Sequence, residues 1–283
     1  MWPDLGLCLL GVAVGTIGTL IGAGGGFILA PILALLYASA EPDTLASISL
    51  AVVFANSCMG TLAYARLKRI AYRPGLAFAA AGVPGALVGA YLASEIARGL
   101  FELVLGTTML VGAILLLLRP KAPSLPPRGR LDPEAASESA DAMHVPTASG
   151  PSVPHLSPRD WKIGIAGSGG VGVLSSLLGI GGGIIHVPLL TLRLRFPVHT
   201  ATATSHFVLA ITSGVGLVAH IAAGSFSSGI HRAIVISLGA LVGAPIGARL
   251  STRLHGNAIL RGLSLALAAV GVRMVWMGFR LMR

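Results

Sequence analysis

Two glycine clusters inside hydrophobic stretches are the features of this sequence best suited to binding chemistry. They comprise Gly22, Gly24, Gly25 and Gly26 in the first half, and Gly179, Gly181, Gly182 and Gly183 in a similar stretch of the second half. A helix broken inside a membrane exposes backbone N–H groups at the start of its second part, and no water competes for them. Glycine also lets a ligand approach the backbone closely. The clusters therefore predict two helix ends that bind an anion.

Hydroxyl, amide and imidazole side chains in the apolar segments are the second group of candidates. Each is expensive to bury in lipid unless it pairs or faces a cavity, and each can donate to an anion without a permanent charge. These residues are Ser49, Asn56 and Ser57 in the first half and His186, Thr204, Ser205, His206 and Ser213 in the second. We predict that they bind substrate together with the glycines, and that His206 or His186 is a candidate for carrying a coupled proton. For each residue, packing or bonding within the helix bundle is the alternative.

Long apolar segments must position these residues, and they occur in two matching sets. The segments run through 5–37, 45–65, 74–93 and 97–118 in the first half, and through 163–192, 200–222, 231–250 and 257–282 in the second. About 20 apolar residues cross a bilayer, so the last three segments of each set predict single transmembrane helices. The first of each set is too long for one crossing. We predict that it enters the membrane, breaks at the glycines and returns.

Composition places the chain in a membrane and excludes several classes of function. Apolar residues make up 54% of the chain and charged residues only 11%, well below the charged share of soluble domains. Lys and Arg punctuate the ends of apolar segments, which argues against a nucleic-acid partner despite the net charge of +10. We find no metal-ligand cluster, no catalytic constellation and no nucleotide-binding motif. We therefore expect no metal, no cofactor and no enzymatic activity.

Loop charge predicts the orientation of the segments, because Lys and Arg collect on the cytoplasmic side. In the first half, basic residues follow the second segment: Arg66, Lys68, Arg69 and Arg73. In the second half, they precede the second segment: Arg193 and Arg195. The two halves are therefore predicted to be inverted repeats, with both termini outside. We divide the chain into a first membrane repeat (1–118), a flexible, proline-rich cytoplasmic linker (119–162) and a second membrane repeat (163–283). The predicted class is all-α and polytopic, each repeat being a glycine-broken, re-entrant helical hairpin followed by three transmembrane helices.

The sequence resembles the sulfite exporter (TauE/SafE) family of bacterial membrane permeases. The resemblance rests on the paired Gly-x-Gly-Gly-Gly clusters, each followed by a proline (Pro31 and Pro188), and on the Ser/Thr-bearing segments after them. It implies a multi-pass protein of the bacterial cytoplasmic membrane that moves a sulfur-containing anion.

We expect a secondary transporter that holds a small anion between the two broken segments near the bilayer midplane. The substrate expected is a sulfur oxyanion or an organosulfonate. An anion channel and a transporter of an unrelated small organic acid are the alternatives. The expected partners are the anion and the lipid bilayer. The sequence leaves open the coupling proton or cation, the direction of transport and the oligomeric state.

Overall fold

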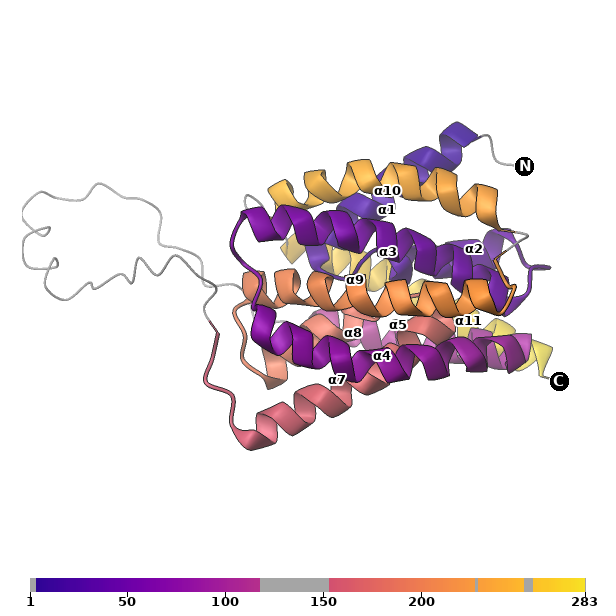
Figure 1. The fold of residues 1–283 in the computed structure, drawn as a ribbon. Coiled ribbons are helices and arrows are strands. Elements are labelled where there is room, and N and C mark those ends of the chain that lie inside the picture. Colours follow the sequence, from indigo (N-terminus) through magenta and orange to yellow (C-terminus); the bar gives the residue numbers. More distant parts are fainter. Residues whose placement is uncertain (1–3, 118–152, 227–228, 252–256, 283) are drawn as a thin grey trace, which may run out of the picture.

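The chain folds into a bundle of α-helices that lie side by side along roughly one direction (Figure 1). This computed structural model describes residues 4–117, 153–226, 229–251 and 257–282. Within those ranges it contains helices, turns and bends but no β-strand. The predicted all-α class is confirmed.

The helices of the two halves follow the same order of lengths. The first half contains α1 (Asp4–Ile21), α2 (Gly26–Leu36), α3 (Pro42–Arg66), α4 (Tyr72–Glu95) and α5 (Arg98–Leu117). The second contains α7 (Pro158–Leu178), α8 (Gly183–Pro188), the π-helical turn η1 (Leu189–Arg193), α9 (Val198–Ala222), α10 (Ile230–Leu250) and α11 (Asn257–Leu281). In each half, one long helix is followed by a short one and then by three long ones.

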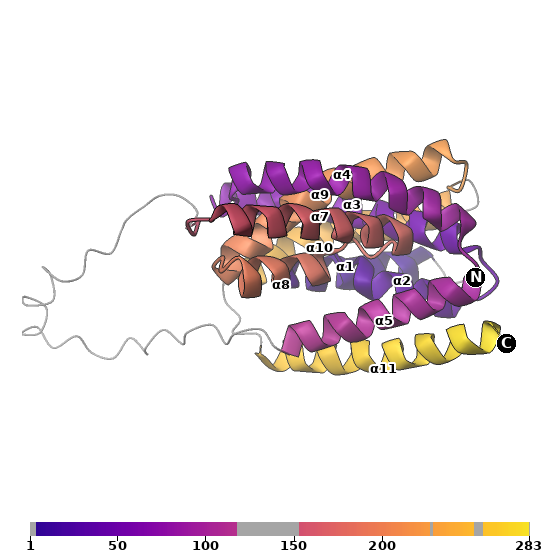
Figure 2. The ribbon, with the colours of Figure 1, turned by 90° about the horizontal axis from the view of Figure 1, so that it is seen from below.

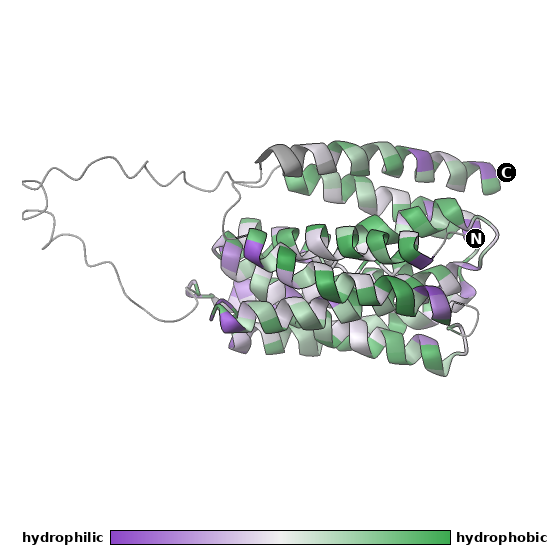
Figure 3. Ribbon diagram, turned by 90° about the horizontal axis from the view of Figure 1, so that it is seen from above, coloured by the Kyte–Doolittle hydropathy of each residue, from purple (hydrophilic) through white to green (hydrophobic). Residues whose placement is uncertain are grey.

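Seven helices in the described part of the chain are long and apolar enough to cross a membrane. They are α1, α3, α4, α5, α9, α10 and the Ser264–Leu281 part of α11. The apolar helices Gly26–Leu36 and Gly183–Arg193 are shorter. Hydrophobic colouring runs along the lengths of the helices, and hydrophilic residues gather toward their ends (Figure 3). Large apolar side chains such as Leu87, Tyr91 and Leu238 are exposed on the outside, as expected of a surface that faces lipid.

Helix α7 begins at Pro158, inside the segment assigned to the linker and before the predicted start of the second repeat. A capping box explains the earlier start. The hydroxyl of Ser157 accepts from the backbone N–H of Asp160, whose carboxylate accepts from the N–H of Ser157, and proline occupies the first helical position. These short-range signals lie in the sequence, but its apolar pattern does not reveal them.

Small residues bring helices from opposite halves into backbone contact. Gly15 of α1 packs on Ala240 of α10, and a Cβ added to Gly239 would overlap the carbonyl oxygen of Cys8 in α1. In the same way, Gly85 of α4 packs against the backbone of α7 at Gly169. Close approach of this kind is a main source of helix association in lipid, where apolar burial drives little.

The contacts also give the relative directions of the helices. Helices α1 and α10 run parallel, and so do α4 and α7, because residue numbers rise together along the two helices of each pair from one contact to the next. Helices α3 and α9 are antiparallel, because Gly60 meets His206 whereas Leu50 meets Gly216. Helices α5 and α11 are antiparallel too. Every one of these pairs joins the first half of the chain to the second.

The two ends of the bundle differ in charge. We call the end where α1 begins and α11 ends the termini end, and the opposite end, where α5 ends and α7 begins, the linker end (Figures 1 and 2). The basic residues at the ends of α3, η1 and α10, and at the start of α4, lie at the linker end: Arg66, Lys68, Arg69, Arg73, Arg193, Arg195 and Arg249. Acidic residues at the termini end include Glu41, Asp43 and Glu95.

Candidate functional site

Both glycine clusters interrupt a helix, as the sequence predicts. Helix α1 ends at Ile21 and α2 begins at Gly26, while α7 ends at Leu178 and α8 begins at Gly183. The residues that precede the second helices, Gly25 and Gly182, have φ values of 84° and 68°, in the left-handed region that favours glycine. The chain can therefore reverse direction over a few residues and start a new helix inside the bundle.

The two breaks face each other in the middle of the bundle. A Cβ added to Gly26 would lie 2.5 Å from the carbonyl oxygen of Gly179, and one added to Gly183 would lie 2.5 Å from the Cα of Ala23. Both loops also pack on Val53, which lies near the middle of α3. Only hydrogen atoms fit between these backbones, so the contact explains why glycine occupies both positions.

The start of α2 presents backbone donors that no side chain caps. Its N-cap residue, Gly25, has no side-chain acceptor to offer. The first N–H groups of an α-helix have no partner within the helix, and the helix dipole adds partial positive charge there. This end of α2 therefore suits a negatively charged group.

Unpaired buried polar atoms gather on α3 beside the first glycine loop. The Nδ2 of Asn56 and the Oγ of Ser57 are buried, and neither has a hydrogen-bond partner in the described chain. The Ser57 hydroxyl borders Gly24, and Thr61, one turn further along α3, also has an unpaired hydroxyl. The other amide atom of Asn56, Oδ1, accepts from Thr19 Oγ1 at 3.1 Å. Buried donors normally find acceptors, so these atoms are candidates for binding water or a polar ligand.

His206 closes the same region from α9. Its ring is fully buried against Gly60 and meets the ring of Tyr64 edge-on, with 5.6 Å between centroids. The carbonyl of Gly22 lies close by, yet neither ring nitrogen reaches hydrogen-bond geometry with a partner in the described chain. His206 therefore packs against α3 one turn beyond Asn56 and Ser57.

The aligned serines Ser49 and Ser205 tie each half to the glycine loop of the other. Ser49 Oγ donates to the carbonyl oxygen of Gly179 at 2.6 Å, and Ser205 Oγ donates to that of Gly22 at 3.1 Å. Both hydroxyl protons are therefore committed to the backbone in this conformation. In this state the two serines position the loops rather than donate to a ligand.

Three of the predicted site residues face other partners. Thr204 accepts from the backbone N–H of Ala71 at 3.1 Å, just before α4 begins. Ser213 donates to the carbonyl of Leu209 in its own helix. The Nε2 of His186 lies 3.1 Å from Ser168 Oγ on α7, and its ring meets Phe78 edge-on. In this structure these three side chains therefore bond within the helix bundle, which is the alternative role stated for each of them.

The C-terminal end of α2 is fixed by a partly buried ion pair. Arg98 of α5 donates to Glu102 at 2.7 Å, to the carbonyl of Ala40 at 2.5 Å and to that of Ala34 at 3.1 Å. The carbonyls at the end of a helix lack donors within the helix, and the guanidinium provides those donors here. This contact holds α2 in place at the termini end, opposite its glycine end.

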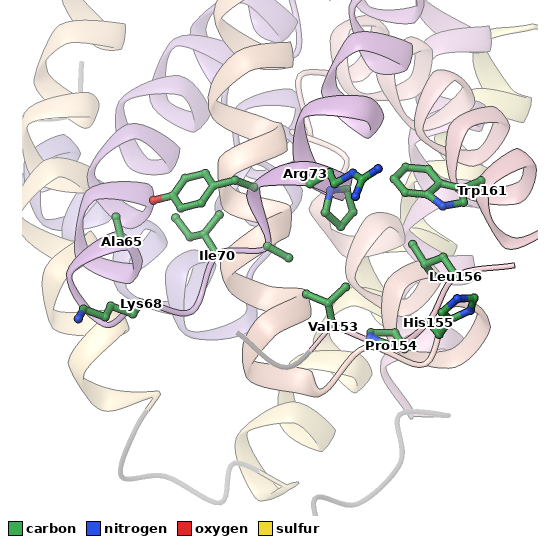
Figure 4. Close-up of a pocket in the computed structure, with 12 residues that line it drawn as sticks. Ala65, Lys68, Ile70, Arg73, Val153, Pro154, His155, Leu156 and Trp161 are labelled. Atoms are coloured by element: carbon green, nitrogen blue, oxygen red, sulfur yellow. The ribbon is translucent and has the colours of Figure 1, made fainter. Parts of the chain in front are cut away.

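Sequence reasoning missed Thr19, Thr61, the Arg98–Glu102 pair and the cavity of about 740 Å³ at the linker end. Figure 4 shows the cavity, whose wall includes Lys68, Arg73, His155 and Trp161, and none of the described residues that line it is acidic. Comparing the two repeats would have singled out Thr19, since it aligns with a second hydroxyl residue, Ser176, whose Oγ is buried without a partner in the described chain. No group of three or more His, Cys, Asp or Glu side chains within the described ranges could hold a metal ion.

Comparison with known proteins agrees with these features. The family model described as Sulfite exporter TauE/SafE matches residues 7–274. The chain is 29% identical to the probable membrane transporter protein YunE of Bacillus subtilis, over 96% of this chain and 97% of that protein. It is 26% identical to a probable membrane transporter protein of Methanocaldococcus jannaschii, over 95% of this chain and 94% of that one. No solved structure matches. A multi-pass helical chain, matched by the family model over nearly its whole length and by relatives named as membrane transporters, belongs to the sulfite exporter TauE/SafE family.

Proposed function

We propose that this membrane transporter is a secondary permease for a small anion, a sulfur oxyanion or an organosulfonate, bound at the start of α2. The observation that carries the proposal is the set of unpaired buried donors, Asn56 Nδ2 and Ser57 Oγ, beside the uncapped glycine end of α2. Several donors converge there without a charged side chain, which favours an anion that must be released again.

The helix directions support alternating access. Counterpart helices in the two halves, α3 with α9 and α5 with α11, are antiparallel. This arrangement suits inverted repeats that hold a substrate at their interface and rock against each other. The bonds from Ser49 and Ser205 cross that interface and would have to break and reform as the halves move.

The charge of the two ends supports an orientation with the linker end in the cytoplasm of a bacterial cell. Lys68 and Arg73 border the cavity at that end, where their charge would raise the local concentration of an anion. The termini end would then face outward.

Reconstituted vesicles test the proposal. Purified protein would be assayed for uptake of sulfite, methanesulfonate and acetate over a range of concentrations. We expect saturable flux of at least one sulfur anion and weaker flux of acetate. Flux that rises without saturation would instead favour a channel, and preference for acetate would favour the organic-acid alternative.

Ser57 and Ser213 provide a matched pair of variants. Loss of a hydrogen bond to a charged ligand costs about 1.5–3 kcal/mol, so Ser57→Ala should weaken apparent substrate affinity about tenfold to a hundredfold. Ser213→Ala should leave affinity unchanged, because that hydroxyl serves its own helix. Equal effects of the two variants would remove Ser57 from the site.

A further inference from the structure

His220, in the last turn of α9, is bonded through both ring nitrogens. Its Nδ1 lies 2.5 Å from Asp43 Oδ1, and its Nε2 lies 3.1 Å from the carbonyl oxygen of Ser176. The His220 side chain is 0% exposed and that of Asp43 is 15% exposed. Asp43 belongs to α3 and Ser176 to α7, so the imidazole joins a helix of the first half to two helices of the second.

Both contacts of His220 require a proton. A carbonyl oxygen only accepts, so Nε2 must carry its hydrogen to bond Ser176. The remaining contact, between Nδ1 and the Asp43 carboxyl, then needs a second proton on one of those two groups. The pair therefore holds one proton more than a neutral imidazole beside an ionised carboxylate. Without that proton, one of the two contacts sets a lone pair against an acceptor oxygen.

We propose that the Asp43–His220 pair is a proton-binding site that closes the termini end of the transporter and couples proton binding to anion movement. The coupling rests on the function proposed above, whereas proton-dependent closure does not. The bound proton holds α3 against α7 and α9, and its release loosens that contact. By linkage, the closed conformation binds this proton more tightly than the open one, so acid favours closure.

The position of Ser176 connects this pair to the glycine loops. Ser176 lies in the last turn of α7, directly before the break that begins at Gly179. Gly179 in turn accepts the hydrogen bond from Ser49 of α3. The end of α7 thus contacts His220 through Ser176, and the loop that follows it contacts the start of α2 through Gly179.

Few other groups face the pair. The Ser225 hydroxyl lies beside the Asp43 carboxylate, and Glu41, just before α3, is exposed. Other charged side chains described at this end have partners of their own: Arg98 with Glu102, His231 with Asp4, Arg232 with the ring of Tyr37, and Arg280 with the ring of Trp276.

The His231–Asp4 pair is a natural control. Its Nε2–Oδ1 distance is 2.9 Å, it lies at the same end of the bundle and it contains the same two residue types. Its side chains are 64% and 65% exposed, so water can replace either partner. Removing this pair should not alter any proton-dependent closure.

Thermal unfolding of the purified full chain between pH 5.5 and 8.5 tests proton binding without any substrate. Where one native-state proton is linked to folding, the apparent unfolding constant changes up to about tenfold per pH unit. We expect the wild type and His231→Gln to be more stable at acid pH than at alkaline pH. We expect His220→Gln and Asp43→Asn to lose this extra stability at acid pH. Asp43→Asn serves alone if His220→Gln does not fold. An identical pH profile in the wild type and both pair variants would overturn the proton site.

Transport with an imposed pH gradient tests coupling. Methanesulfonate stays ionised over this range, so its uptake into vesicles reports flux through the protein. We expect the gradient to change uptake at least threefold in the wild type and in His231→Gln, and to have no effect in His220→Gln. An equal response in His220→Gln would overturn coupling. If pH-linked unfolding is present but no sulfur anion is carried, the proposed substrate fails and the proton site stands.

Discussion

Replacing Gly26 with alanine would test whether the two glycine loops must touch. The added Cβ would lie 2.5 Å from the Gly179 carbonyl oxygen and 2.8 Å from the carbonyl carbon of Ile180. Ordinary contacts of a Cβ begin near 3.4 Å, so the loops would have to separate by about 1 Å. Gly26 is the first residue of α2, and alanine is the better helix former, so the cost comes from the contact and not from the backbone.

We expect this overlap to cost about 1–3 kcal/mol, the usual range for overpacking against a neighbour that can shift. The loops should separate, and the start of α2 should move relative to the donors on α3. If this cost destabilises the substrate-bound conformation, the flux or the apparent affinity falls about fivefold to a hundredfold. Melting temperature in detergent would report stability, and vesicle uptake of the transported anion would report function.

Gly170 supplies the control for this experiment. It lies in α7, and a Cβ added there would meet nothing within 4 Å. Gly170→Ala should therefore be neutral or slightly stabilising, by up to about 1 kcal/mol. If Gly26→Ala transports within twofold of wild type and melts at the same temperature, close contact of the loops is not required and the reasoning fails.

Four further single substitutions test hydrogen bonding and packing within the bundle. Ser49→Ala and Ser205→Ala should each lower the free energy of unfolding by about 0.5–1.5 kcal/mol, the net value of one hydrogen bond, and no change in the melts would mean that the loops find other donors. Arg98→Ala leaves the Glu102 carboxylate, 1% exposed, without its partner, so we expect a loss of about 3–5 kcal/mol in the melt and partial recovery in Arg98→Ala with Glu102→Gln. Gly239→Val should separate α1 from α10 and lower expression or melting temperature, and normal behaviour would show that this contact is dispensable.

Local features of this protein were predictable because they depend on neighbours in the chain. Apolar segment lengths indicated six of the seven described helices that are long enough to span the membrane, all but α1, and the runs of glycine marked both helix breaks. Glycines spaced four apart in α10, such as Gly239 and Gly243, lie on one helix face, and the structure packs that face against α1. The start of α7 was placed too late, because its signal is a cap and not an apolar pattern.

The sequence thus determined a polytopic helical chain with two broken segments, since length, hydropathy and glycine spacing act within a few turns. Only the tertiary structure decided which polar groups are free. Ser49 and its acceptor at Gly179 are 130 residues apart, and His220 and Asp43 are 177 residues apart. Hydroxyls that look alike in sequence therefore have different roles: Ser49 and Ser205 bind backbone carbonyls, Ser213 bonds its own helix, and Ser57 has no partner among the described residues. A hydrogen bond depends on where the partner's atoms lie, and packing between the two halves sets that position.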